Sequence, residues 1–327
     1  MKSDEILILT KEIEDTTDTI MQYLNYLNAK IKRIHREDII SDIEVAISDN
    51  KQDDKINIFS GEKKMQIDSN TKLWYRRGDF SYKFPISNQN IDEKLSKYLL
   101  EEWSLIKYYI HDYTTILGGY YKEFRNNKLE NLHIARNCGM NIPHTLITNN
   151  KEKLRLFIEK HQKVITKPVH GGHLSFTTNS KIYSGKGIVF VDEEKVEKSN
   201  DMFCPSLFQN YIDKKYEIRI FFIENQLFPM AIFSQLDEKT KYDFRNYNRE
   251  NPNRNVPYKL PKTIEDKILC FINKSQLKTG SIDLIHSIED KYIFLEVNPT
   301  GQFGWVSDNC NYYLEKRIAE FLINFQK

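Results

Sequence analysis

The chain has 327 residues, of which 40% are hydrophobic and 29% are charged, and this composition indicates a globular protein of two or three domains. Its 48 Lys and Arg against 46 Asp and Glu leave a net charge of +2, which argues against a general nucleic-acid or membrane surface. The opening MKSDEILILT does not have the pattern of a signal peptide, and no apolar run reaches membrane-spanning length. Four dispersed cysteines without a C-x-x-C pair fit neither a zinc site nor a disulfide framework, so we expect a reducing, cytoplasmic location.

The first elements predict a small α/β domain. Glu5–Thr10 is apolar enough for a buried strand, and Ile20, Leu24 and Leu27 follow at helical spacing. A second strand is expected to begin near Lys30, and the order strand, helix, strand favours parallel pairing. Further strands are predicted at residues 43–48, 55–59, 64–68 and 72–80, and a domain boundary at residues 85–92.

Helices and antiparallel strands are predicted after this boundary. A long helix is expected at residues 92–113, and a shorter one after Asn126 should end near Gly139. Lys163–Pro168 has the pattern of a strand that runs into a Gly-containing turn at residues 170–172. Further elements are a strand after Pro143, a helix at 151–161, paired strands at 176–191 and within 207–233, a helix at 263–275, and a hairpin with arms 281–288 and 291–298.

The second arm of this hairpin ends in Phe-Leu-Glu-Val-Asn-Pro and places polar oxygens at a strand end. Because side chains alternate along a strand, Glu296 and Asn298 should point to one face. Leu295 and Val297 should then point into the core. Pro299 cannot donate to a strand ladder, so we expect the strand to end there.

Pairing within the hairpin should bring Asp283 of the first arm next to Glu296 and Asn298. Mg²⁺ prefers oxygen ligands and often shares its coordination between protein and nucleotide phosphates, so this trio predicts a magnesium site. Lys167 at a strand end and Lys128 at a helix start are placed to neutralise phosphate oxygens, and the P-loop motif is absent. Taken singly, each motif also fits polar groups that simply face solvent.

The order of these residues resembles that of the ATP-grasp ligases, from about Asn126 to the C-terminus. This resemblance implies an α/β (α+β) fold with an N-terminal small α/β pre-ATP-grasp domain at residues 1–88. A central domain with the long helical stretch and the first ATP-grasp subdomain would occupy 89–205, and the C-terminal ATP-grasp subdomain with the metal site 206–327. The matching residues are Lys128, Lys167-Pro168, the hinge Gln209-Asn210-Tyr211-Ile212, Glu217, Arg219, Asp283, Glu296 and Asn298.

Further motifs resemble a narrower group, the ATP-grasp maturases of ribosomally made peptides. The sequence is similar to the graspetide synthetases of the microviridin type, and within them most similar to the grasp-with-spasm maturases. With these motifs the resemblance covers nearly the whole chain. They are ILILT before a D-T-T-D helix, WYRR at Trp74–Arg77, I-P-x-T-L-I-T, DFR at Asp243–Arg245 and PYKLP at Pro257–Pro261.

The resemblance implies a reaction in which ATP and Mg²⁺ are used to phosphorylate an Asp or Glu side chain of a precursor peptide. A Ser or Thr hydroxyl, or a Lys amine, of the same peptide then attacks the acyl phosphate and forms an ester or amide crosslink. ADP and phosphate are released. It further implies an ATP-binding set that consists of Lys128, Lys167, Gln209, Asn210, Tyr211 and Ile212. Glu217 would contact the ribose, residues 170–172 would cover the phosphates, and the metal would be bound by Asp283, Glu296 and Asn298. Arg219 or Arg245 would stabilise the anionic intermediate.

The implied partner is a precursor peptide with a leader and a core that contains Thr or Ser and Asp or Glu, and neither nucleic acid nor membrane is expected. The first domain with the helix at 92–113 is the region we expect to contact the leader. Relatives are often homodimers, which this sequence neither supports nor excludes. The hinge pair Gln209-Asn210 departs from the Gln-acid pair of many relatives, which leaves the choice between ATP and GTP open.

Two alternatives stay open at this stage. The first is an ATP-grasp ligase that joins free amino acids or small carboxylic acids to an amine, as in the glutathione synthetase and ribosomal-protein glutamylating branches. The second is a non-catalytic module that binds nucleotide. Intact Lys128, Lys167, Asp283, Glu296 and Asn298 argue against the module, because only catalysis needs all five.

Overall fold

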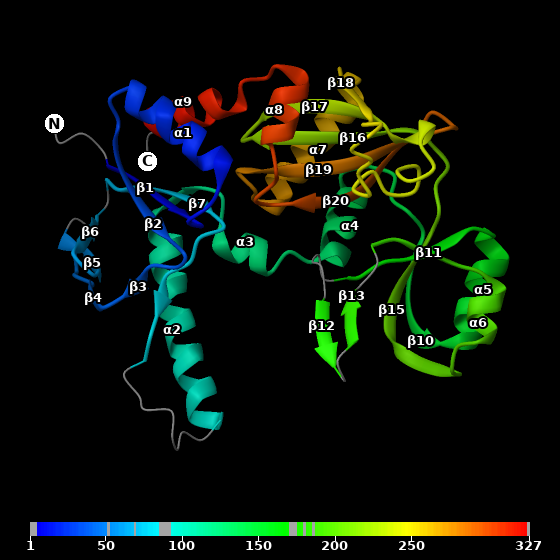
Figure 1. Ribbon diagram of the computed structural model, residues 1–327, viewed down its shortest axis with the longest axis horizontal. Coiled ribbons are helices and arrows are strands. Elements are labelled where there is room, and N and C mark those ends of the chain that lie inside the picture. The colour runs from blue at the N-terminus through cyan, green and yellow to red at the C-terminus, as the bar shows by residue number, and fades with distance from the viewer. Residues whose placement is uncertain are drawn as a thin grey trace. The chain divides into compact units, whose positions relative to one another are not determined.

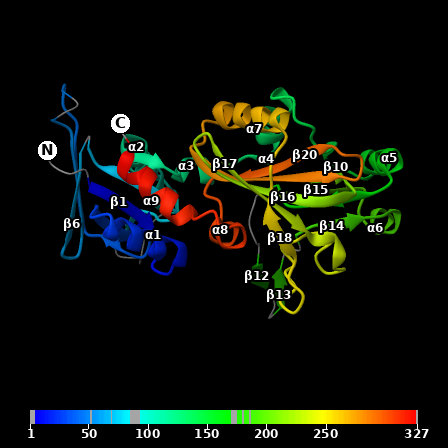
Figure 2. The same cartoon turned by 90° about the horizontal axis from the view of Figure 1, so that it is seen from above.

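The structure is a computed structural model, and it describes residues 5–50, 53–68, 70–84, 93–169, 175–178, 181–184 and 187–325 (Figure 1, Figure 2). The chain divides into two compact units. Unit 1 comprises Met1–Arg125, Leu277–Gly280 and Pro299–Lys327, and unit 2 comprises Asn126–Gln276 and Ser281–Asn298. The three-domain division stays a prediction, but the contacts differ from it in grouping residues 299–327 with the N-terminal residues.

Unit 1 is built on a four-stranded sheet in the order β2-β1-β7-β9, in which every pair is parallel. A three-stranded meander, β4-β5-β6, and the pair β3-β8 flank this sheet. The elements are β1 Glu5–Thr10, α1 Asp15–Tyr26, β2 Lys30–His35, β3 Ile39–Ile40, β4 Asp42–Ala46, β5 Lys55–Ser60, β6 Lys63–Ile67, β7 Lys72–Arg76, β8 Ser81–Tyr82, α2 Glu93–Thr114, β9 Thr115–Leu117, α3 Tyr120–Phe124, α8 Gly304–Cys310 and α9 Leu314–Asn324.

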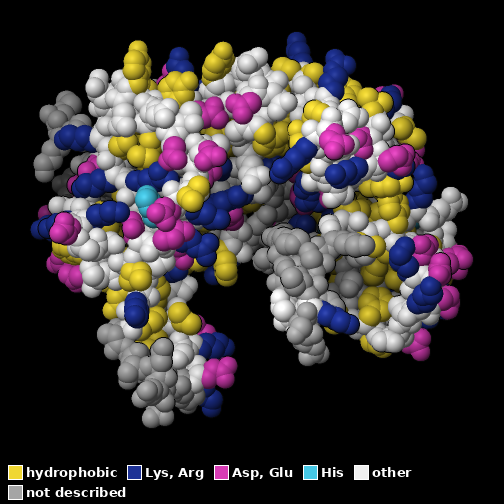
Figure 3. Space-filling model, viewed as in Figure 1, with side chains coloured by type: hydrophobic (Ala, Val, Ile, Leu, Met, Phe, Trp, Pro, Cys, Tyr) yellow, Lys and Arg dark blue, Asp and Glu magenta, His cyan; other side chains and the backbone are white. Residues whose placement is uncertain are grey.

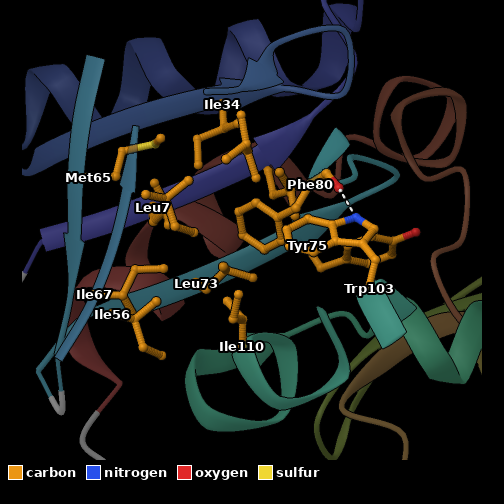
Figure 4. Packing of buried hydrophobic residues seen from close by; sticks show 13 residues of the cluster. Leu7, Ile34, Ile56, Met65, Ile67, Leu73, Tyr75, Phe80, Trp103 and Ile110 are labelled. Atoms are coloured by element: carbon orange, nitrogen blue, oxygen red, sulfur yellow. Dashed lines mark hydrogen bonds between the residues drawn. The ribbon is translucent and has the colours of Figure 1, made fainter. Parts of the chain in front are cut away.

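The core of unit 1 joins the parallel sheet, the meander and α2 (Figure 4). Leu7 of β1, Ile56 of β5 and Trp103 of α2 are all buried in it. The Trp103 indole Nε1 donates a hydrogen bond to the Phe80 carbonyl at 3.2 Å, so this aromatic side chain is buried without an unpaired donor. Large apolar side chains such as these supply about 1.5–3 kcal/mol each on burial.

The predicted strand at residues 72–80 is too long, because β7 ends at Arg76. Arg77 adopts a positive φ of 58°, which takes the chain out of the strand. The next residue is Gly78, and a Cβ there would overlap backbone atoms of Leu9 and Thr10. The turn therefore depends on a glycine that lets two backbone segments approach closely.

Unit 2 contains two larger sheets and a hairpin. One sheet has the order β10-β15-β11-β14, the other the order β18-β17-β16-β19-β20, and β12 pairs with β13. The elements are α4 Lys128–Asn137, β10 Thr145–Asn150, α5 Lys151–His161, β11 Val164–Thr166, β12 Ser175–Thr178, β13 Lys181–Ser184, β14 Val189–Val191, α6 Glu193–Glu197, β15 Met202–Asn210, β16 Lys214–Ile223, β17 Gln226–Phe233, the 3-10 helix Ser234–Leu236, β18 Arg254–Pro257, α7 Lys262–Ser275, β19 Thr279–Ser287 and β20 Tyr292–Asn298.

Helices cover one face of each sheet of unit 2. The helices α4 and α7 pack against each other, and α4 contacts β20 (Figure 2). The rings of Phe271 on α7 and Phe294 on β20 are 4.8 Å apart in the core beneath them. The helices α5 and α6 cover the four-stranded sheet, with Leu154 and Ile158 buried against it.

The predicted mixed α/β class and most predicted elements are confirmed. The hairpin turns at Glu224-Asn225 and Glu289-Asp290 lie where expected, and Glu224 and Asp290 adopt positive φ angles of 48° and 61°. The segment 176–191 differs in detail, since β14 pairs with β11 instead of with the preceding strands. Within the described part of the chain, no helix is both long and apolar enough to cross a bilayer.

Candidate functional site

A cleft in unit 2 lies between β11 and β15 of one sheet and β16, β19 and β20 of the other. It contains about 780 Å³ of space including its open mouth. The lining residues are Pro143, Ile165, Lys167, Ile188, Gln209, Asn210, Tyr211, Ile212, Lys214, Glu217, Ile218, Ile232, Tyr242, Asp243, Phe244, Arg245, Asp283, Leu284, Ile285, Leu295 and Glu296.

The hinge that follows β15 has one backbone donor left over. The Asn210 N–H donates to the His144 carbonyl at 3.2 Å, and the Tyr211 N–H donates to the Lys163 carbonyl at 2.8 Å. The Ile212 N–H has no acceptor among the described residues. A free backbone N–H at the wall of an apolar cleft is suited to a ring nitrogen of a nucleobase.

The polar side chains of the hinge are used within the chain. Gln209 is 1% exposed, and its amide nitrogen donates to Thr145 Oγ1 at 2.9 Å. The side-chain oxygen of Asn210 accepts from the His144 N–H at 2.7 Å. Base recognition at this hinge is therefore left chiefly to the backbone and to the apolar walls, among them Ile165, Ile188, Ile232 and Leu295.

Glu217 is not the exposed surface glutamate that its lysine-rich sequence neighbourhood allowed. It is 7% exposed, forms a buried ion pair with Lys214, and accepts from Ser234 Oγ at 3.2 Å. Lys214 Nζ also donates to the Tyr242 carbonyl at 3.4 Å. Burial raises the pKa of Glu217, and the charge of Lys214 opposes that shift. The carboxylate is thus held in a fixed position at the cleft wall.

Asp283 and Glu296 face each other across the β19–β20 pair. The register shifts just after them, because Leu284 pairs with Phe294 and leaves Leu295 as an extra residue in β20. This β-bulge turns Leu295 toward the cleft, where it lies half-buried in the lining. The prediction that Leu295 points into the core is therefore wrong, whereas Val297 is 2% exposed as expected.

Four cations surround these two carboxylates. Arg219 Nη1 donates to both Asp283 oxygens at 2.9 and 2.7 Å, and Lys128 Nζ lies 3.2 Å from Glu296 Oε2. Arg245 Nη1 lies 3.9 Å from Glu296 Oε1, while the rest of its guanidinium group pairs with Asp243 at 2.8 Å. Lys128 Nζ also donates to the Pro168 carbonyl at 3.1 Å, and Lys167 lines the cleft.

Burial and the nearby cations together shift the pKa values of the two carboxylates in opposite directions. Burial opposes ionisation of Glu296, but the charges of Lys128, Lys167 and Arg245 outweigh it and lower the pKa of Glu296. Burial raises the pKa of Asp283, and Arg219 only partly offsets this. Burial likewise lowers the pKa of Lys167. Such a concentration of positive charge in a cleft attracts a polyanion such as a polyphosphate.

The residues at the end of this hairpin fit a magnesium ion by their chemistry. Asp283 and Glu296 supply hard oxygen ligands on opposite strands, and the ion pairs with Arg219 and Lys128 leave lone pairs on each carboxylate. Among the described residues no three His, Cys, Asp or Glu side chains cluster as ligands, so the set depends on the amide of Asn298 as third member. Asn298 is half-buried, at the end of β20 opposite Ser281.

The structure brings most of the predicted site residues into one cleft. Lys128 and Arg219 reach the cleft carboxylates through their ion pairs although they do not line it, and Asn298 does not line it either. The predicted phosphate loop at residues 170–172 lies outside the described residues. The cleft-lining members of the predicted set are Lys167, Gln209, Asn210, Tyr211, Ile212, Glu217, Arg245, Asp283 and Glu296.

The sequence interpretation missed Lys214 and Tyr242, and it placed Leu295 on the wrong face. Lys214 is 6% exposed and pairs with Glu217, three residues further along the chain. Lysines are rarely this buried, but the sequence does not show the burial, so it could not have indicated this residue. Tyr242 immediately precedes the DFR motif and could have been found as a neighbour of that motif. Its ring centroid lies 6.0 Å from that of Tyr211.

Comparisons with known proteins agree with this geometry. The model of the ATP-grasp domain of prokaryotic glutathione synthetase matches residues 127–270. No curated protein sequence matches the chain.

Solved structures extend the similarity to both units. The RiPP-associated ATP-grasp ligase of Chryseobacterium gregarium, solved with ADP and a leader and core peptide, is 26% identical, with a TM-score of 0.79 over 98% of this chain and 96% of its own. The macrocyclase MdnC of Microcystis aeruginosa MRC, bound to its precursor peptide MdnA, is 26% identical, with a TM-score of 0.77 over 98% of this chain and 100% of its own. The ligase PsnB, complexed with a minimal precursor, Mg and ADP, is 14% identical, with a TM-score of 0.69 over 99% and 97%, and shows the fold alone.

The predicted ATP-grasp fold is therefore confirmed, and so is the predicted resemblance to the maturases of ribosomally made peptides. The chain contains an ATP-grasp domain, and over nearly its whole length it shares its structure with ATP-grasp ligases and macrocyclases that were solved with precursor peptides.

Proposed function

We propose that the chain is an ATP-dependent, ADP-forming ligase that crosslinks side chains within a ribosomally made precursor peptide. One observation carries the proposal. The similarity to the Chryseobacterium ligase includes unit 1 and covers 98% of the chain, far beyond the 127–270 segment common to glutathione synthetases. The small-molecule ligase DcsG, a D-cycloserine synthetase, also aligns over 97% of the chain, but with 11% identity and a TM-score of 0.52 against 26% and 0.79 for the Chryseobacterium ligase.

In this proposal the cleft binds the nucleotide through the hinge and the lysines. The Ile212 N–H donates to the base, the carboxylate of Glu217 accepts from the ribose, and Lys128 and Lys167 bind phosphate oxygens. On nucleotide binding, Lys128 exchanges Glu296 for phosphate, which frees the carboxylate as a ligand. Asp283, Glu296 and Asn298 would hold Mg²⁺, which when bound offsets phosphate charge.

The chemistry then consists of two transfers. An Asp or Glu carboxylate of the peptide attacks the terminal phosphorus of ATP, and ADP leaves. A Ser or Thr hydroxyl, or a Lys amine, attacks the resulting acyl phosphate, loses its proton, and expels phosphate, so each crosslink removes one water from the peptide. Arg219 and Arg245 stabilise the negative charge that develops on the carbonyl oxygen.

The test is mass spectrometry of a Thr- and Asp/Glu-rich peptide encoded beside the gene, incubated with the protein, ATP and Mg²⁺. We expect losses of whole water masses that require ATP. Glu296→Gln should abolish these losses, whereas Glu265→Gln should not, because Glu265 is a half-buried glutamate that pairs with Lys262 on α7, outside the cleft lining. Water losses with Glu296→Gln as large as with the unchanged protein would refute the metal site.

A second candidate is a ligase of free amino acids, which the match to the glutathione synthetase domain favours. In the same assay it predicts an unchanged peptide, with ADP released only when free amino acids are added.

A further inference from the structure

Two of the four cysteines meet in unit 2 although they lie far apart in the sequence. Cys138 follows the last turn of α4 and is buried, and Cys270 is half-buried on α7. The two thiol groups lie within hydrogen-bonding reach of each other. Rotation of the side chains can bring sulfur atoms in such contact to the bonding distance of about 2 Å, so this pair can become a disulfide.

The packing of the two helices keeps the two thiols opposite each other. One face of α7 presents, at spacings of three and four residues, Lys267, Cys270 and Lys274. Lys274 Nζ donates to the Asn137 carbonyl at 3.3 Å. A Cβ on Gly139 would lie 3.5 Å from Lys267 Cε. The residues on either side of one cysteine thus contact the residues one turn before and after the other.

The two sulfur atoms differ in reactivity. Burial and the neighbouring thiol raise the pKa of Cys138 to about 11, so this group stays protonated near neutral pH. Cys270 is more accessible, and Lys267 and Lys274 stand one turn away on either side of it. Acidic and basic side chains are intermixed on the visible face of unit 2 (Figure 3), so distant charges largely offset one another and these near lysines favour the Cys270 thiolate. The thiolate is the form that reacts with peroxides, so Cys270 is oxidised first.

We propose that Cys138 and Cys270 are a redox-sensitive pair that forms a reversible disulfide with hydrogen peroxide as the oxidant. The Cys270 sulfur attacks one peroxide oxygen and keeps it as a hydroxyl, the O–O bond breaks, and the other oxygen leaves as water with the thiol proton. The Cys138 sulfur then attacks the sulfur of this sulfenic acid, and the hydroxyl leaves as a second water with the Cys138 proton. The two thiols give up two electrons, the peroxide accepts them, and a dithiol reverses the bond.

The bond closes the segment from residue 138 to residue 270 into a ring. This segment carries Lys167, the hinge at residues 209–212 and Glu217, whereas neither cysteine lines the cleft. A disulfide that closes a long segment stabilises the fold mainly by restricting the unfolded chain. The pair therefore clamps unit 2 under oxidising conditions and leaves the cleft unobstructed. In a compartment that keeps thiols reduced, such a bond forms only transiently, as in a redox sensor.

The test uses the full chain in a Cys204→Ser background, which removes the exposed cysteine that could link two chains. After hydrogen peroxide, the intact mass should fall by two hydrogen atoms, and a non-reducing digest should contain two peptides joined through Cys138 and Cys270. Cys310 should remain open to alkylation after denaturation, and dithiothreitol should restore the starting mass. An unchanged mass, oxygen addition without joined peptides, or a joined pair that includes Cys310 would overturn the proposal.

Thermal unfolding tests the clamp. The oxidised chain should unfold about 5–15 °C higher than the same chain after reduction. Adding Cys270→Ser to the background should abolish this difference, whereas adding Cys310→Ser, at the buried cysteine of unit 1, should retain it. Each variant is compared with itself before and after peroxide, so a lower stability of the variant does not affect the result. A joined pair without a rise, or an equal rise with Cys270→Ser, would show that the bond does not clamp unit 2.

Discussion

Arginines are buried among acids in both units, but their surroundings differ. In unit 1, Arg76 is 3% exposed, and its Nη1 donates to the carbonyls of Thr300 and Gly301 at 3.0 and 2.6 Å. Its Nη2 donates to Glu14 at 3.1 Å. In unit 2, Arg219 donates to Asp283, which lines an open cleft. A charge enclosed by its own chain stabilises the fold, whereas a charge held against a cleft carboxylate can be redirected to a ligand.

The largest expected effect follows from breaking the enclosed network. Arg76→Met removes the hydrogen bonds of the guanidinium group to two backbone carbonyls and the buried charge that pairs with Glu14. We therefore expect a loss of about 3–5 kcal/mol in the free energy of unfolding. Urea denaturation measures this loss. Lys63→Met is the matched control, because the Lys63–Asp38 pair is exposed and should contribute less than about 1 kcal/mol. A loss as small as that of the control would mean that the Arg76 network is not structural.

The corresponding change in the cleft should affect turnover. Arg219→Met removes the charge that offsets the burial of Asp283 and removes a candidate stabiliser of the anionic intermediate. We expect a fall in kcat of about 10²–10³-fold in the peptide assay. Arg155→Met is the control, since Arg155 pairs with Glu152 and Glu197 on the surface and should leave kcat unchanged. An unchanged kcat with Arg219→Met would remove this arginine from the proposed mechanism.

A buried histidine in unit 1 makes its stability depend on pH. His111 is 3% exposed and stacks on Tyr120 at 4.9 Å, and neither ring nitrogen has a hydrogen-bond partner among the described residues. Burial, with help from the charge of Lys107, lowers the pKa of His111 to about 3. The unfolded chain therefore takes up this proton first, near pH 6.5, and stability decreases as the pH falls below that value.

We expect this histidine to account for a loss of about 2 kcal/mol between pH 6.5 and pH 5, at about 1.4 kcal/mol per pH unit. Urea denaturation at both pH values should show the loss in the unchanged chain and a smaller one in His111→Phe. His133→Gln alters an exposed histidine and should retain the full loss. The same pH dependence in all three chains would show that other groups are responsible.

These contrasts also separate what the sequence could predict from what it could not. The apolar strand Glu5–Thr10, the helix at 262–275 and the turn at Glu289-Asp290 have strong local signals, and the structure contains them. The β-bulge at Leu295 has no local signal, because it depends on which residue of β19 lies opposite. The packing of residues 299–327 with the N-terminal residues is likewise set by distant contacts, such as the bond from Lys72 Nζ to the Ile323 carbonyl at 2.7 Å.

The same limit applies to the cleft. The spacing of Asp283, Glu296 and Asn298 could be interpreted from strand periodicity, and the structure places the first two opposite each other. The ion pairs of Glu296 with Lys128 and of Asp283 with Arg219 could not be predicted. Lys128 and Arg219 belong to other elements, and ion pairs between elements produce no periodic pattern in the sequence. Lys214 shows this most clearly. It and its neighbour Lys215 are both lysines, but Lys214 is buried and Lys215 is exposed.

These two neighbouring lysines allow a test of the difference between an enclosed structural charge and a charge at the cleft, and its expected effect is the smallest of those described. Lys214 is buried against Glu217, whereas Lys215 forms an exposed pair with Asp290. Without Lys214, the buried Glu217 keeps the pKa-raising effect of burial but loses the charge that opposes it, so its carboxylate should become a poorer acceptor for the ribose. We therefore expect Lys214→Met to raise the KM for ATP by about tenfold, equivalent to about 1.4 kcal/mol, with little change in kcat.

A comparison of the KM for ATP with that for 2′-deoxy-ATP tests whether Lys214 positions Glu217 for the ribose or only stabilises the fold. The unchanged chain should prefer ATP, Lys214→Met should lose most of that preference, and Lys215→Met should keep it. A chain that is merely less stable would bind both nucleotides less well and retain the preference. If Lys214→Met retains it, Glu217 does not accept a hydrogen bond from the ribose 2′-hydroxyl under the control of Lys214.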